Sequence, residues 1–132
     1  MKSSFCIDLQ RFMLIPTKFP LTQEMLKSNI QKWIDDKEFT KGGLTIEDIA
    51  RQTASNRTYV SHFVNTHYGM SFREWINYLR LQYAKDIMLK SPDKSVADIA
   101  LESGYLSTSY FSRIFKETEG LAPGRWIEEM CH

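Results

Sequence analysis

Residues 95–120 read SVADIALESGYLSTSYFSRIFKETEG, and this pattern occurs twice in the chain. The earlier copy is residues 45–69, TIEDIARQTASNRTYVSHFVNTHYG. The two copies align at an offset of fifty in their first part and of fifty-one from Tyr59 and Tyr110 onward. The second copy therefore contains one inserted residue, and the chain carries an internal repeat of a small structural unit.

Each copy predicts two helices joined by a tight turn. In the first copy, Thr45 is suited to cap a short helix and Asn56 to cap a longer helix that ends at a glycine. Ser95 and Ser107 take these places in the second copy. Two short helices joined in this way form a helix-turn-helix unit, so we expect one such unit over each of the two ranges quoted above.

The turn inside each unit favours a residue with a positive φ angle. Gly104 meets this requirement in the second unit. The first unit has Ala54 at the equivalent place, which predicts either a cost of about 1 kcal/mol or a different turn.

The segment between the copies predicts a long linking helix. Residues 72–89 place apolar side chains three and four positions apart and contain no proline or glycine. Such a helix is roughly 25 Å long at 1.5 Å per residue, and Pro92 follows it. Trp75 and Trp126 occupy equivalent places in the repeat among aliphatic neighbours, so we interpret both as core residues.

Upstream of the repeat, the spacing of Leu26, Ile30 and Trp33 predicts one more amphipathic helix. Two prolines interrupt the preceding segment, so residues 1–21 are expected to be an irregular extension and residues 22–132 a single domain. The expected fold is all-α, with two helix-turn-helix subdomains joined by a long linking helix.

The second helix of each unit carries the candidate contacts with a ligand. In helix-turn-helix proteins this helix lies in the major groove of DNA, with base-reading side chains in its N-terminal half. The polar side chains expected to point outward are Arg57, Thr58, Ser61, His62 and Asn65 in the first copy and Thr108, Ser109, Ser112, Arg113 and Lys116 in the second. Arg113 is the strongest candidate for sequence readout, because a guanidinium can donate two hydrogen bonds to the O6 and N7 atoms of guanine.

The charge balance neither requires nor excludes a polyanionic partner. The chain of 132 residues has a net charge of +1, and residues 45–132 contain 10 basic and 11 acidic side chains. A nucleic-acid-binding domain usually presents a basic stripe. The case for DNA therefore depends on where the charges lie rather than on their sum.

Other function classes find little support in the sequence. It has no glycine-rich phosphate loop and no paired metal-ligand motif, and His62 and His67 are five positions apart, off a common helix face. We therefore expect no enzymatic activity, catalytic site, metal or cofactor. No run reaches the eighteen or so apolar residues of a membrane span, and the N-terminus lacks a signal-peptide pattern, so we expect a cytoplasmic protein with no membrane partner.

Over residues 44–128 the chain resembles the DNA-binding domain of the AraC/XylS family of bacterial transcription regulators. The motifs that carry the resemblance are Ile99-Ala100, Ser103-Gly104-Tyr105, Tyr110 to Lys116, Gly120 to Pro123 and Trp126 in the second half, and Leu44-Thr45, Ile49-Ala50, Tyr59-Val60-Ser61, Gly69 to Phe72, Leu79-Arg80-Leu81 and Ala84 in the first half and linking helix. Two positions depart from the family pattern: His62 stands where an arginine is common, and Ala54 where glycine is usual.

The resemblance implies a fold of about seven helices and sequence-specific binding to double-stranded DNA. Two recognition helices are then expected to read adjacent major-groove segments of asymmetric promoter sites. It also implies a regulator that activates transcription through contact with RNA polymerase, and a separate sensor or dimerisation domain as a partner. Carried over by position, the base-contacting sites fall on Thr58, Ser61, His62, Thr108, Ser109, Ser112 and Arg113. Phosphate contacts are then expected from Arg57, Asn65, Ser107 and Lys116.

A helical protein-interaction module without DNA specificity is the alternative. Small helical domains with near-zero net charge often bind proteins, and the acidic residues Glu47, Asp48, Asp98 and Glu102 on the first helix of each unit could face a basic partner. The two hypotheses differ in their response to salt, because counterion release weakens DNA binding steeply as the salt concentration rises.

Overall fold

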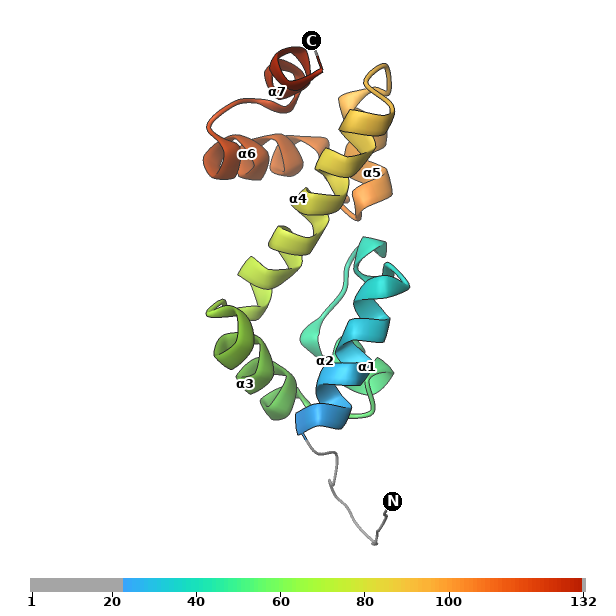
Figure 1. The fold of residues 1–132 in the computed structure, drawn as a ribbon, viewed down its shortest axis with the longest axis vertical. Helices are drawn as coiled ribbons and strands as arrows, with labels where there is room; N and C mark the ends of the chain where they lie inside the picture. The colour runs from blue at the N-terminus through green and yellow to red at the C-terminus, as the bar shows by residue number, and fades with distance from the viewer. Residues whose placement is uncertain (1–22, 132) are drawn as a thin grey trace, which may run out of the picture.

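The computed structural model describes residues 23–131, and all regular secondary structure in this part of the chain is helical. Its elements, in order, are α1 (Gln23–Asp35), the 3-10 helix η1 (Glu38–Thr40), α2 (Ile46–Gln52), α3 (Arg57–Tyr68), α4 (Phe72–Lys90), α5 (Val96–Ser103), α6 (Thr108–Glu119) and α7 (Pro123–Met130) (Figure 1). The expected all-α fold with seven α-helices is confirmed, whereas η1 was not anticipated. The extension predicted for residues 1–21 lies outside the described residues. None of the described helices is long and apolar enough to cross a membrane.

The four predicted capping residues all begin helices of the two units. The side chains of Thr45, Asn56, Ser95 and Ser107 each accept a hydrogen bond from the backbone N–H three residues further on, at 2.9–3.2 Å. These bonds satisfy backbone donors that have no partner inside the helix, so the local sequence alone fixes where α2, α3, α5 and α6 begin.

The turn residues of the two units adopt the same left-handed conformation. Gly104 has φ 110° and Ala54 has φ 59°, so the first unit keeps the turn and accommodates the strain of a side chain there. Just before the turns, the buried hydroxyls of Thr53 and Ser103 donate to the backbone carbonyl four residues earlier, at 2.8 and 2.7 Å. The two turns are therefore built alike up to this point.

The inserted residue of the second unit is Leu106. Ser55 N–H donates to the Ala50 carbonyl at 2.8 Å, and Tyr105 N–H donates to the Ala100 carbonyl at 2.9 Å, so Ser55 and Tyr105 are equivalent. Ser55 is followed at once by a helix cap, while Tyr105 is followed by Leu106 and then by the cap. Leu106 is 80% exposed.

Two separate hydrophobic cores lie along α4. The first core joins α1, η1, α2 and α3 to the N-terminal half of α4 and ends at Leu79, and the second core begins at Leu81 and joins α5, α6 and α7 to the C-terminal half. Trp75 belongs to the first core and Trp126 to the second, both buried, as the repeat predicts. Each helix-turn-helix unit thus packs on its own half of one shared helix.

The two longer helices of the units lie at opposite ends of α4. In Figure 1, α3 lies beside the lower end of α4 and α6 beside its upper end, both to the left, whereas α1, α2 and α5 lie to the right. At 1.5 Å per residue, the 19 residues of α4 span about 28 Å. The fold therefore presents α3 and α6 along one side of the molecule.

Candidate nucleic-acid interface

The polar side chains of α3 lie opposite its buried face. Val60, Phe63 and Val64 are buried in the first core. The predicted contact residues of this helix are all exposed: Arg57, Thr58, Ser61, His62 and Asn65. The helical spacing of the apolar residues fixes this outward face.

The same arrangement recurs on α6. Phe111 and Phe115 are buried in the second core. The exposed contact candidates are Thr108, Ser109, Arg113 and Lys116, with Ser107 at the cap, and Ser112 is half-buried. By the repeat offset, Arg113 stands at the place of His62 and Lys116 at the place of Asn65, so α6 is the more basic of the two faces.

Acidic side chains are absent from the parts of α3 and α6 that would meet DNA. Neither helix has a carboxylate in its first nine residues, whereas α2, α4 and α5 each have one or two in their first turn. A helix N-terminus carries a partial positive charge, which an acidic residue in the first turn offsets. The N-terminal ends of α3 and α6 therefore keep this charge available to an anion such as a phosphate.

Both candidate arginines form ion pairs within the protein. Arg57 Nη1 lies 3.0 Å from Glu47 Oε2, and Arg113 Nη1 lies 3.4 Å from Glu117 Oε2. The side chains of Arg113 and Glu117 are 59% and 61% exposed, and pairs at such a position contribute little. A phosphate or a base can therefore displace either carboxylate.

Neither carboxylate partner was anticipated from the sequence. Glu117 follows Arg113 by four positions on a helix, so its spacing could have indicated the pair. Glu47 is ten positions from Arg57 and on another helix, so only the tertiary structure brings those two together.

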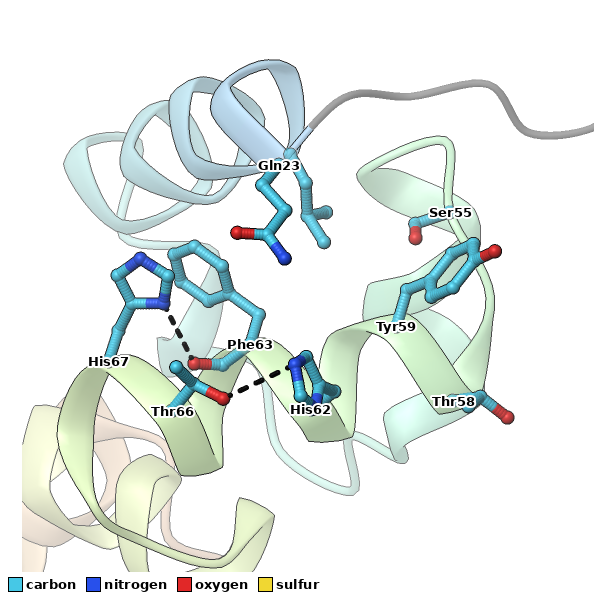
Figure 2. Close-up of a pocket in the computed structure, with 9 residues that line it drawn as sticks. Gln23, Ser55, Thr58, Tyr59, His62, Phe63, Thr66 and His67 are labelled. Carbon is cyan, nitrogen blue, oxygen red and sulfur yellow. Dashed lines mark hydrogen bonds between the residues drawn. The ribbon is translucent and has the colours of Figure 1, made fainter.

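A pocket borders the outer face of α3. Figure 2 shows Gln23 of α1 on one side of it, and Thr58, His62, Thr66 and His67 of α3 on the other. His62 Nε2 lies 3.4 Å from the Thr66 hydroxyl. His62 thus lines this pocket and is also one of the candidate DNA contacts. Within residues 23–131, no group of three or more His, Cys, Asp or Glu side chains could hold a metal ion.

His67 has a different environment from His62. Its ring stacks on Phe63 with 4.0 Å between the centroids, and its Nδ1 lies 3.2 Å from the Phe63 carbonyl oxygen. These contacts hold the exposed His67 ring against its own helix.

Comparison with known proteins identifies the fold and the family. A family model described as "Helix-turn-helix domain" matches residues 49–129. The HTH-type transcriptional regulator ExsA of Pseudomonas aeruginosa is 35% identical over 80 residues, which are 61% of this chain and 28% of that protein. The virulence regulon transcriptional activator VirF of Yersinia enterocolitica is 29% identical over 99 residues, 75% of this chain and 35% of that protein.

Among solved structures, the C-terminal domain of AraT, a response regulator from Geobacillus stearothermophilus, has the same fold. It superposes with a TM-score of 0.71 at 24% identity, covering 82% of this chain and 87% of that one. The chain spans about a third or less of the two curated relatives above. The matched region begins inside α2 and covers the rest of both helix-turn-helix units. The chain therefore belongs to the AraC family of transcription regulators, of which it is the C-terminal helix-turn-helix domain.

Proposed function

We propose that this domain regulates transcription by binding double-stranded DNA in a sequence-specific way, with α3 and α6 in two adjacent major-groove segments. The observation that carries the proposal is the position of two equivalent polar helices at opposite ends of α4, on one side of the molecule (Figure 1). Successive major-groove faces of B-DNA lie about 34 Å apart, and α4 spans about 28 Å. The dimensions therefore suit two readers one helical turn apart.

The exposed side chains divide into two roles under this proposal. Base contacts come from Thr58, Ser61, His62, Thr108, Ser109, Ser112 and Arg113, and phosphate contacts from Arg57, Asn65, Ser107 and Lys116. Arg113 reads guanine through two donors, and the serines and threonines can serve either bases or phosphates. The Ser107 hydroxyl accepts from Tyr110 N–H as a helix cap, and its own proton can still be donated to a phosphate.

We further propose that the regulation is activation, through contact of the DNA-bound domain with RNA polymerase. Support comes from VirF, which is named as a transcriptional activator and matches most of this chain. Transcription in vitro from a promoter that carries the selected site tests this step. A rise in transcript on addition of the protein is expected, whereas a fall would identify a repressor.

Selection of sites from a random duplex DNA pool tests the DNA-binding proposal. Enrichment of a bipartite motif with centres about ten base pairs apart is expected. The enriched site is then measured at two salt concentrations, and the affinity should fall steeply with salt. No enrichment, or binding that does not respond to salt, would favour the protein-interaction alternative.

A further inference from the structure

The two helix-turn-helix units meet at one small cluster beside the centre of α4. The helices α1 and η1 share the first core with α2 and α3, so the first unit is taken to include them. Its residues 37–41 fold back along α4 and come close to α5. In the second unit, the turn that contains Gly104 and Tyr105 lies against the same part of α4. Arg80, which stands between the two cores at Leu79 and Leu81, lies at the centre of this cluster.

Arg80 connects both units through its guanidinium. Its Nε donates to the Phe39 carbonyl and its Nη2 to the Lys41 carbonyl, both at 2.8 Å. The guanidinium carbon also lies 5.6 Å from the centroid of the Tyr105 ring. One planar side chain on α4 thus holds the backbone of the first unit and faces an aromatic ring of the second.

The backbone at Gly104 packs so closely on Arg80 and Phe39 that no side chain would fit there. A Cβ atom added to Gly104 would lie 2.7 Å from Arg80 Nε and 2.9 Å from the Phe39 carbonyl oxygen. The side chain of the inserted residue Leu106 lies over Gly42, so a Cβ atom added to Gly42 would overlap the Leu106 side chain. The second turn is therefore in direct contact with the first unit, and the insertion contributes to this contact.

Asn77 adds a second connection, one helical turn before Arg80. Its Oδ1 accepts from the Tyr105 hydroxyl at 2.9 Å, and its Nδ2 donates to the Tyr110 hydroxyl at 3.3 Å. Burial raises the pKa of the Tyr105 phenol above its usual value, so the hydroxyl keeps its proton and donates this bond at alkaline as well as neutral pH. Tyr110 belongs to α6, so this connection reaches the recognition helix itself.

We infer that Arg80 is a positioning residue that fixes the orientation of α6 relative to α3 and thereby sets the spacing of the two DNA half-sites. Without its donors, the two units would be joined only by α4 and by the packing of the second turn on residues 39–42, and a bend at the centre of α4 would move α6 relative to α3. One added base pair shifts a half-site by about 3.4 Å and rotates it by about 35°. Units that are locked together cannot follow such a change.

This inference rests on the proposed two-headed binding, and its first test uses DNA. The site selected by the wild-type protein is remade with one base pair inserted or removed between its halves. Wild-type affinity should fall by about tenfold or more. In Arg80→Met, which keeps the unbranched stem and loses the donors, the fall should be less than about threefold, with affinity for a single half-site unchanged.

Two further variants separate positioning from charge and from misfolding. Lys90→Met removes a positive charge from the exposed end of the same helix and should retain wild-type spacing discrimination. Arg80→Lys, which cannot bond to both carbonyls at once, should show a loss of affinity on altered spacing that lies between those of wild type and Arg80→Met.

The salt dependence of DNA binding by Arg80→Met should equal that of wild type. A reduction of the salt slope by about one would mean that Arg80 contacts a phosphate and would overturn the inference, as would spacing discrimination equal to wild type in Arg80→Met.

A measurement without DNA keeps the inference separate from the proposed function. Spin labels at Asn65→Cys and Lys116→Cys, equivalent exposed positions on α3 and α6, are placed in a background with Cys6→Ser and Cys131→Ser. Electron-electron distance measurement should give a narrow distribution with Arg80 present and a broader one in Arg80→Met. Broadening supports the positioning role even if the wild-type protein selects no bipartite site. An unchanged distribution would overturn it.

Discussion

The guanidinium of Arg113 lies over the ring of Tyr110, one turn earlier on α6, with 5.1 Å between its central carbon and the ring centroid. The Tyr110 hydroxyl is in turn bonded to Asn77 of α4. Arg113, the strongest candidate for reading a base, therefore packs on a ring whose hydroxyl is hydrogen-bonded to the linking helix α4. Such support reduces the side-chain freedom that Arg113 would lose on binding a base.

Replacing these two residues should weaken DNA binding to different degrees. Arg113→Ala should cost about 1–3 kcal/mol at the selected site and relax the preference at one base position. Tyr110→Leu, which removes the ring, should cost about 0.5–1 kcal/mol, and Tyr110→Phe, which keeps it, much less. Binding titrations on the selected site and on single-base variants measure this. Equal losses in Tyr110→Leu and Tyr110→Phe would show that the ring does not support Arg113.

Removing the carboxylate that pairs with Arg113 should strengthen binding. Glu117→Gln releases the guanidinium and removes a negative charge beside the phosphates, so the affinity at low salt should rise by about 0.5–1 kcal/mol. Glu128→Gln is the matched control, because Glu128 is exposed and pairs with Arg125 of α7 rather than with a residue of α6. An equal gain in both variants would mean that only the net charge of the protein matters.

Alanine should be tolerated at Gly120 and not at Gly104. Both glycines have positive φ angles, 84° and 110°, but nothing lies within 4 Å of a Cβ at Gly120. Gly120→Ala should lower the free energy of unfolding by about 1 kcal/mol through backbone strain alone. Gly104→Ala adds the overlap with Arg80 and Phe39, for a total of about 2–5 kcal/mol. Urea denaturation compares the two, and similar losses would contradict the close packing at Gly104.

Glycine at position 54 should stabilise the protein. Ala54 is exposed and has φ 59°, so Ala54→Gly removes strain without removing buried contacts. The free energy of unfolding should rise by about 0.5–1 kcal/mol, after allowance for the greater freedom of glycine in the unfolded chain. Ala97→Gly, at an exposed position inside α5, should instead lower it by about 1 kcal/mol. A loss in both variants would show that Ala54 is not strained.

The local elements of this fold could be predicted because their causes are local. Capping residues such as Thr45 and Ser107 bond to backbone groups only three positions away, and apolar spacing decides which face of a helix is buried. The repeat then identified both helix-turn-helix units and the outward positions of α3 and α6. His62 and Arg113 could be chosen as candidates for the same reason, since helical periodicity places them opposite the cores.

The sequence by itself thus determined the helices of the two units, their buried faces and their outward polar faces. Only the tertiary structure decided how the two units are held relative to each other. Arg80 bonds to carbonyls 41 and 39 positions away, and Asn77 to hydroxyls 28 and 33 positions away. Backbone carbonyls carry no sequence signal, and a polar residue such as Asn77 reveals a distant partner only when the chain is folded. The short helix η1 was not predicted for the same reason. Buried Phe39 packs against Tyr83 of α4, and this tertiary contact, rather than a periodic sequence pattern, holds η1 in place.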